Sequence, residues 1–315
     1  MQYLPTVLVA TFATLHSVDK PFSELDHALV RRHFARAAST YGDAAVLARE
    51  VERRMLERLD YLKLAPRRIV DAGCGPAAGL RELGRRYPAA ELIGIDAAEA
   101  MLRGAVSAAT FGERARRLFG RGGPRFVCAD MRALPLASGG CGMLWSNIGL
   151  AFAGEPQAAL REFARVLEPG GLLMFSVFGP DTLRELRAAF AQADTLAHVH
   201  DFADMHDLGD MLAASGFATP VMDMEMITLT YADVASLARD LRASGQTNAL
   251  ASQRRTLTGK MRWRHMADAY EAVRRREDGR LPASFEVVYG HAWKGAPRMS
   301  GQSVVKFDFP RRPNR

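Results

Sequence analysis

Hydrophobic residues recur at spacings of three and four positions in two stretches near the start of the chain. Residues 26–40 and 44–62 share this spacing, which predicts two amphipathic helices. A short apolar run then leads into VDAGCG, which ends at Gly75, and a helical pattern follows over 77–87. The order of strand, glycine-rich turn and helix therefore begins just after Pro66.

The alternation of strand and helix continues along the chain. Apolar runs predict further strands, and helical patterns follow most of them: strands at 91–96, 125–130, 141–147 and 170–178, with helices near 98–109, 155–167, 181–195 and 207–217. Two more strands are expected near 218–224 and 285–293. Strands joined through helices indicate a parallel sheet covered on both faces. We expect a Rossmann-like α/β fold with a seven-stranded, mostly parallel sheet.

The chain divides into segments of different character. The segment between the last two strands is too long for a hairpin loop, so we expect it to fold as a helical cap over the carboxyl ends of the strands. The expected segments are a disordered extension at 1–23, an N-terminal helical lid at 24–66, a ligand-binding core at 67–225, the cap at 226–282, the final core strand at 283–296 and a basic tail at 297–315.

Composition excludes several classes of protein. The 315 residues are 48% hydrophobic and 24% charged, which is typical of a globular protein and not of a disordered chain. The three cysteines form no CxxC pair, so neither a zinc site nor a secreted disulfide framework is indicated, and we expect a cytoplasmic protein. The apolar stretch from Leu4 to Leu15 is too short to cross a bilayer, and no membrane role is expected.

Positive charge is concentrated in the last quarter of the chain. The formal net charge is +7, and residues 241–315 hold 16 basic against 6 acidic side chains. Such a segment favours an anionic partner, which could be a nucleic acid, an acidic protein or a charged small molecule.

The glycine turn is the strongest candidate for a binding site. At the switch point of a doubly wound sheet a ligand can approach the backbone only where side chains are absent, which explains Gly73 and Gly75. The third glycine is Gly79, a spacing that differs from the dinucleotide pattern, and Pro76 disfavours a pyrophosphate cradle. Asp96 ends the next strand, where an acid can accept hydrogen bonds from ribose hydroxyls. The alternative is an ordinary turn, with Asp96 as a helix cap.

These motifs together resemble a known family. VDAGCG, GID, CADMRALPL and LEPGG are similar, in order and spacing, to the S-adenosylmethionine-dependent class I methyltransferases over about residues 67–225. The resemblance implies S-adenosylmethionine as cofactor and no metal. It places Gly73, Gly75 and Asp71 at the methionine part, Asp96 and Ala97 at the ribose, Met101, Asp130 and Met131 at the adenine, and Ser146 and Asn147 facing the sulfonium. Met101 and Met131 could instead be plain core residues.

A closer resemblance lies in the flanking segments. Residues 33–45, 178–186, 230–248 and 281–295 look like the biotin-pathway malonyl-acyl-carrier-protein O-methyltransferases, so that the match covers about residues 30–295. A sister group consists of complex I assembly factors, some of which hydroxylate a protein arginine. By this resemblance Tyr41 closes over the cofactor; the alternative is an aromatic residue packed at a helix end.

The resemblance implies methylation of the free carboxylate of malonyl-acyl-carrier protein or malonyl-CoA. A carboxylate with a pKa of ~4 is already ionised, so the protein needs only to align the reactants, and no catalytic base is expected. One feature departs from the family, which usually shows an acidic residue entering the fourth strand and a His-Trp or Gln-Trp pair after Ser-Asn. Here Ala151 and Phe152 occupy the pair, which leaves the acceptor open, although Phe152 can supply an aromatic wall.

The basic cap suggests where substrate and partner bind. An acidic acyl-carrier protein with a malonyl thioester would dock on cations of the cap, for which the candidates are Arg254, Arg255, Lys260, Arg262 and Arg264. Candidates for the substrate carboxylate are Arg184, Arg262, Arg264, His291 and Lys294. Each docking candidate could instead belong to a solvated helix face, and His291 could be a core residue with its hydrogen bonds satisfied. An RNA methyltransferase is a further alternative, but no RNA-binding module is recognisable, and we expect a monomer without nucleic acid.

Overall fold

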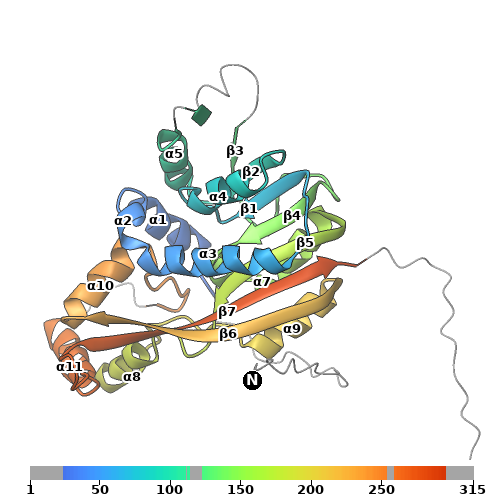
Figure 1. Ribbon diagram of the computed structural model, residues 1–315. Coiled ribbons are helices and arrows are strands. Elements are labelled where there is room, and N and C mark those ends of the chain that lie inside the picture. The colour runs from blue at the N-terminus through green and yellow to red at the C-terminus, as the bar shows by residue number, and fades with distance from the viewer. Residues whose placement is uncertain (1–23, 111, 114–122, 254–258, 296–315) are drawn as a thin grey trace, which may run out of the picture.

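The computed structural model describes residues 24–110, 112–113, 123–253 and 259–295, and its centre is a seven-stranded sheet (Figure 1). The strand order is β3-β2-β1-β4-β5-β7-β6. The strands are β1 Arg68–Ala72, β2 Glu91–Asp96, β3 Arg125–Cys128, β4 Cys141–Ser146, β5 Leu167–Phe178, β6 Phe217–Tyr231 and β7 Leu281–Lys294. The first five pair in parallel, whereas β7 is antiparallel to both β5 and β6. The predicted fold is confirmed.

Alternate residues along the strands supply two hydrophobic cores, one on each face of the sheet. Met143 and Trp145 of β4 belong to the first core, and Leu144 between them belongs to the second. Strands that are apolar on both faces need helices on both faces. Those of the first core include α3 Val46–Arg58, α4 Ala78–Arg86 and α5 Glu99–Ser107, and those of the second are α7 Pro156–Val166 and α9 Met205–Ala214. Among the described helices, none has the length and apolar character that crossing a membrane requires.

The last two strands form a long ribbon that carries a group of helices at one end. β6 and β7 pair from Phe217 opposite Lys294 to Tyr231 opposite Leu281. Near the Tyr231 end lie α8 Arg184–Ala193, α10 Val234–Ala243 and α11 Lys260–Glu271 (Figure 1). The hydroxyl of Tyr270 in α11 donates a hydrogen bond to the carbonyl of Pro282 at 2.8 Å, which fastens that helix to β7.

Both strands of the ribbon are longer than the sequence pattern predicted. The cap was expected at 226–282, but β6 runs on to Tyr231 and β7 begins at Leu281, so the helical insertion is shorter. The reason is that Met222, Met224 and Met226 alternate with acidic residues, and this period-two pattern pairs with β7 along the whole strand. The predicted extension at 1–23, the tail at 297–315, Arg254 and Arg255 lie outside the described residues.

The N-terminal helices are joined to the segment that follows α10. α1 spans His27–Ala37 and α2 spans Tyr41–Ala44. The Asp26 amide donates to the Ala249 carbonyl at 2.8 Å, and the Thr40 hydroxyl donates to the Ala243 carbonyl at 2.8 Å. The His33 ring and the Thr247 hydroxyl share a hydrogen bond of 2.7 Å. Because these bonds join them, the N-terminal helices and the cap form one continuous cover.

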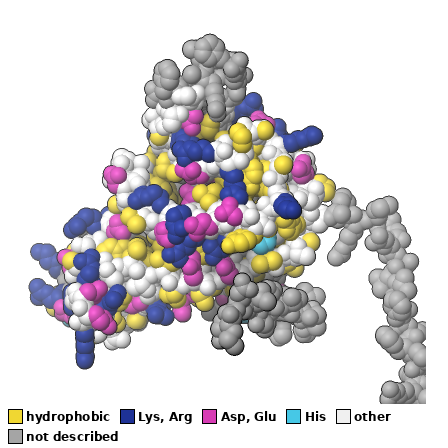
Figure 2. Space-filling model, viewed as in Figure 1, with side chains coloured by type: hydrophobic (Ala, Val, Ile, Leu, Met, Phe, Trp, Pro, Cys, Tyr) yellow, Lys and Arg dark blue, Asp and Glu magenta, His cyan; other side chains and the backbone are white. Residues whose placement is uncertain are grey.

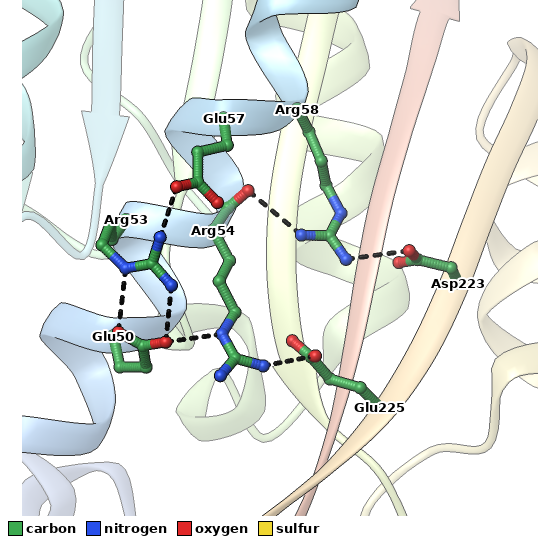
Figure 3. Close-up of polar contacts among 7 residues, drawn as sticks. All are labelled: Glu50, Arg53, Arg54, Glu57, Arg58, Asp223 and Glu225. Carbon is green, nitrogen blue, oxygen red and sulfur yellow. Dashed lines mark hydrogen bonds and ion pairs between the residues drawn. The ribbon is translucent and has the colours of Figure 1, made fainter.

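Helix α3 is held across the far edge of the sheet by ion pairs (Figure 3). Arg58 pairs with Asp223 of β6 at 2.8 Å, and Arg54 pairs with Glu225 of the same strand. The guanidinium of Arg58 also lies 3.8 Å from the centre of the Tyr289 ring of β7. α3 is therefore anchored to the ribbon, while α1 and α2 extend from it over the carboxyl ends of the strands (Figure 1).

Candidate active site

The turn after β1 forms the floor of a cavity at the carboxyl ends of the strands. Gly73 and Gly75 both have positive φ, at 82° and 50°, a conformation that glycine adopts without strain. The Gly73 amide donates to the Ile95 carbonyl at 2.8 Å, which ties the turn to β2. A Cβ atom at Gly73 would lie 3.3 Å from both Gly149 Cα and Met131 Cε. The turn thus keeps open a space that a side chain would narrow.

The cavity above this turn has a volume of about 430 Å³. Its wall contains nine of the eleven residues predicted to bind the cofactor: Tyr41, Gly73, Gly75, Asp96, Ala97, Met101, Asp130, Met131 and Asn147. The two exceptions are Asp71 and Ser146, which do not reach the cavity. Tertiary structure therefore brings together residues from β1, β2, the loop after β3, the end of β4 and the N-terminal helices.

Asp96 is the acid best placed for a ribose. Its Oδ2 accepts a hydrogen bond from the Gly75 amide at 2.9 Å, and its Oδ1 accepts one from the Ala98 amide at 2.8 Å. Each carboxylate oxygen can accept two hydrogen bonds, so each retains one site for a ligand hydroxyl. Burial raises the pKa of Asp96, while the two amides act in the opposite direction.

The opposite part of the cavity suits a flat, weakly polar ring. Met101, Ala97 and Cys128 line it, and Asp130 stands beside them. Arg132 holds the Asp130 carboxylate through hydrogen bonds of 2.7 Å to Oδ2 and 3.1 Å to Oδ1, which lower its pKa. Asp130 is therefore an ionised acceptor kept in place by a neighbouring arginine, a role for Arg132 that the sequence did not indicate.

The end of β4 differs from the prediction. Ser146 is fully buried and donates its hydroxyl hydrogen bond to the Ala72 carbonyl at 2.8 Å, so it cannot face a bound sulfonium. Asn147 lines the cavity, but its amide group donates to the Ala48 carbonyl at 2.9 Å and accepts from the Ser176 hydroxyl at 2.8 Å. These side chains fasten the strand ends to one another, because buried polar groups at strand ends must find partners.

Two acids lie behind the glycine turn, one buried and one partly buried. Asp71 is buried, and desolvation followed by the nearby Glu52 and Asp96 raises its pKa well above the usual value. Glu52 of α3 accepts a hydrogen bond from the Trp145 indole at 3.3 Å, and burial raises its pKa to about 7. A Cβ atom at Gly79 would lie 1.6 Å from Glu52 Oε1, so the third glycine of the motif makes room for this carboxyl group. No sequence pattern pointed to Glu52.

A second, apolar pocket lies under the cap. It has a volume of about 190 Å³, and its lining comes from α8, α10, α11 and the loop before α9. Apolar members include Leu186, Leu237, Leu241, Trp263 and Met266. Phe152 and Gln246 line both this pocket and the cofactor cavity, so the two spaces meet at these side chains. The predicted aromatic wall at Phe152 therefore stands at the boundary between them.

An imidazole near this boundary is unsuited to act as a base. His200 lines the apolar pocket, and its Nε2 accepts a hydrogen bond from the Ala249 amide at 2.9 Å. Burial lowers its pKa to about 4, so the ring is neutral at physiological pH. Its ring also packs against Phe152, with 5.8 Å between centroids. This histidine holds the cap segment in place.

None of the residues predicted for the substrate lines either space. Lys294 donates to the Leu167 carbonyl at 2.7 Å, at the opposite edge of the sheet, because β7 runs antiparallel and its carboxyl end points away from the site. His291 sits between Met174 and Val221 within the sheet. Arg184 is exposed and pairs with Glu185 at 3.5 Å. Arg262 and Arg264 lie on α11, whose Trp263 and Met266 face the pocket in their place.

Comparison with known proteins agrees with this geometry. Residues 70–175 match the family model described as a methyltransferase domain. The malonyl-[acyl-carrier protein] O-methyltransferase of Laribacter hongkongensis is 50% identical over 90% of this chain and 96% of its own length. The enzyme of the same name from Gallionella capsiferriformans is 48% identical over 90% of this chain and 97% of its own. The solved structure of the YcgJ protein from Bacillus subtilis shares the fold, with a TM-score of 0.55 and 15% identity over 79% of this chain and 99% of its own. The chain thus belongs to the malonyl-[acyl-carrier protein] O-methyltransferase family, a branch of the S-adenosylmethionine-dependent class I methyltransferases.

Proposed function

We propose that this protein methylates the free carboxylate of a malonyl group carried as a thioester by acyl-carrier protein, the substrate in the names of its relatives. The observation that carries the proposal is the wall shared at Phe152 and Gln246, because these two side chains line both a cofactor-sized cavity and an apolar pocket. A substrate arm lying in the pocket can bring its end group to the cofactor. The cap and the N-terminal helices cover this meeting point.

The cofactor cavity fits S-adenosylmethionine. The space kept open by Gly73 admits a group lying against the backbone, and the free acceptor sites of Asp96 suit a pair of ribose hydroxyls. Met101 and Met131 offer apolar surfaces for an adenine, and Asp130 offers an acceptor for its amino group. Tyr41 lines the cavity from the N-terminal side and lies 3.9 Å from the position of a Cβ on Gly75. We propose these roles for the nine lining residues.

The proposed reaction needs alignment more than proton transfer. When bound, S-adenosylmethionine supplies a methyl group attached to a positively charged sulfur. An oxygen of the malonyl carboxylate bonds to the methyl carbon as the carbon–sulfur bond breaks, and the electron pair of that bond returns to sulfur. No proton moves, which fits a junction where His200 is neutral and already hydrogen-bonded. Phe152 and the cover exclude water and so favour the displacement.

The carrier protein is proposed to dock on the basic end of the molecule. Dark-blue side chains gather over the α10 and α11 end in Figure 2. Lys260 and Arg264 of α11 are exposed. An acidic carrier would be attracted to this end and held near the pocket. We retain Lys260, Arg262 and Arg264 as docking residues, and we propose a monomeric, cytoplasmic enzyme.

A transfer assay tests the proposal. The protein is incubated with methyl-labelled S-adenosylmethionine and with malonyl-, acetyl- or unloaded acyl-carrier protein. We expect base-labile label on the malonyl form alone, because only that form presents a free carboxylate. Tight binding of the cofactor without transfer to the malonyl form would contradict the proposal and would instead favour the assembly-factor branch of the fold.

A further inference from the structure

A surface groove between α1 and α10 carries three arginines. Arg36 of α1 faces Arg239 and Arg242 of α10 across it, and the remaining lining includes His33, Thr40, Thr247 and Asn248. All three arginine side chains are exposed. The groove lies on the N-terminal side of the cap and contains none of the α11 cations considered above.

These arginines differ from many of the other arginines that the structure describes. Among the described residues none of the three forms an ion pair, whereas arginines elsewhere, such as Arg54, Arg81 and Arg165, are paired with carboxylates. Burial, followed by the charge of Arg36, lowers the pKa of His33, so this ring adds no positive charge at neutral pH. Three guanidinium groups that line one groove and form no ion pair within the described part of the chain suit an anionic ligand.

The groove adjoins the apolar pocket. Arg242, Thr247 and Asn248 line both spaces. Helix α10 supplies both, since Leu237 and Leu241 line the pocket while Arg239 lines the groove on another side of the same helix. The cofactor cavity, the apolar pocket and the groove are therefore neighbours in a row, with shared walls at Phe152 and Gln246 and at Arg242, Thr247 and Asn248.

We propose that this groove binds the phosphate of the carrier protein's phosphopantetheine arm. The inference rests on the function proposed above and assigns the exit of the substrate arm. The thioester end would lie in the apolar pocket, the amides of the arm would meet Thr247 and Asn248, and the phosphate would be held by Arg36, Arg239 and Arg242. The α11 cations would then contact the surface of the carrier and not its arm.

Two thioesters that differ only in the phosphate test the inference. Malonyl-pantetheine 4′-phosphate and malonyl-pantetheine are compared as methyl acceptors for the wild type and for the triple variant R36Q/R239Q/R242Q. We expect the variant to raise KM for the phosphorylated acceptor about tenfold or more, because each charge-assisted hydrogen bond contributes appreciably. Cofactor affinity should be unchanged, and the KM for malonyl-pantetheine should rise much less than that for the phosphorylated acceptor, because only Arg242 of the three also lines the apolar pocket. The matched control R85Q/R103Q/R276Q removes the same charge from exposed arginines outside the groove and should leave both KM values unchanged.

The outcomes separate this inference from the proposed function. If the wild type methylates both acceptors with equal KM, or if the groove variant loses both equally, the groove does not hold the phosphate. If the wild type methylates neither malonyl thioester nor malonyl-acyl-carrier protein, the proposed function fails. Calorimetry with pantetheine 4′-phosphate then tests, without any methyl transfer, whether the groove binds the phosphate. Binding by the wild type and the control, but not by the groove variant, would support the site; no binding by any of them would overturn it.

Discussion

The Oδ2 atom of Asp96 accepts a hydrogen bond from the amide of Gly75 at 2.9 Å. This bond joins the end of β2 to the glycine turn after β1, and the other carboxylate oxygen binds the Ala98 amide beside the start of α5. The two interpretations of Asp96, a ligand-binding acid and a helix cap, therefore describe the same side chain. Its position is fixed before any ligand arrives.

Substitution Asp96→Asn should weaken cofactor binding more than folding. Asparagine keeps one acceptor oxygen but loses the negative charge and the second acceptor. Charge-assisted hydrogen bonds contribute about 1.5–3 kcal/mol each, so the Kd for S-adenosylmethionine should rise roughly 10- to 100-fold. Calorimetry measures the affinity, and thermal unfolding of Asp96→Ala, which loses both backbone bonds, provides the comparison. An unchanged affinity for Asp96→Asn would remove the ribose assignment.

Glu52 should make the stability of the fold depend on pH. Burial raises its pKa in the folded protein from 4.5 to about 7, whereas the unfolded chain releases this proton near the ordinary value. Between these values the folded state binds more protons, so the free energy of unfolding falls as pH rises. The free energy of unfolding should fall by at most about 3 kcal/mol through the titration of this one group.

The variant Glu52→Gln should remove this dependence. Glutamine is close in size and carries no charge, so the variant should gain stability over the wild type at pH 8 and little at pH 4.5. Urea unfolding at the two pH values measures the difference. Glu57→Gln on the exposed side of the same helix is the control, with 58% of the Glu57 side chain accessible. A pH slope in Glu52→Gln equal to that of the wild type would show that Glu52 is not the group responsible.

Cys128 should be the one cysteine that reacts in the folded protein, and cofactor should protect it. Cys128 is exposed and lines the cofactor cavity, whereas Cys74 and Cys141 are buried. Burial raises the pKa of Cys74 well above its usual value and that of Cys141 to about 12, so both are poor nucleophiles. Mass spectrometry after iodoacetamide treatment should find one modified site, slowed severalfold by adenosylhomocysteine. Labelling that persists in Cys128→Ser, or that proceeds at the same rate with adenosylhomocysteine present, would contradict this prediction.

Gln246 should position the acceptor where the two spaces meet. Replacing it by glutamate puts a second carboxylate beside that of the substrate, and like charges in a partly buried site repel strongly. We expect Gln246→Glu to lower kcat/KM for the malonyl substrate at least about tenfold, with little change in cofactor affinity. Gln246→Met introduces no charge, so its kcat/KM for the malonyl substrate should fall less. Equal losses for the two variants would indicate a packing role instead.

The succession of strands and helices along the chain and the position of the glycine turn could be predicted from the sequence because their signals are local. A β-strand ending in VDAGCG and another ending in Asp96 are recognisable within a few residues, and parallel strands bring their carboxyl ends to one edge. The same reasoning failed for Ser146, whose hydroxyl turned inward to Ala72. A strand end gives the position of a residue, but the partner of its side chain is set by packing across the sheet.

The residues near the proposed substrate could not be predicted from local sequence signals. Lys294 was chosen for its charge, yet the antiparallel direction of β7 takes it to the other edge of the sheet. Glu52 and Gly79 lie 27 positions apart and become a matched pair only when α3 packs beside α4. The groove at Arg36 and Arg242 likewise forms only when the N-terminal helix lies against the cap.

By itself the sequence determined the α/β fold, the family and most of the cofactor cavity, since these depend on short motifs and on the periodicity of single elements. Tertiary structure alone decided which cations line the proposed substrate path, which acids lose contact with solvent and where the cofactor cavity meets the apolar pocket. The physical reason is that burial, charge pairing and continuity of a cavity are properties of surfaces contributed by several elements. Those surfaces exist only after the lid, the sheet and the cap have packed together.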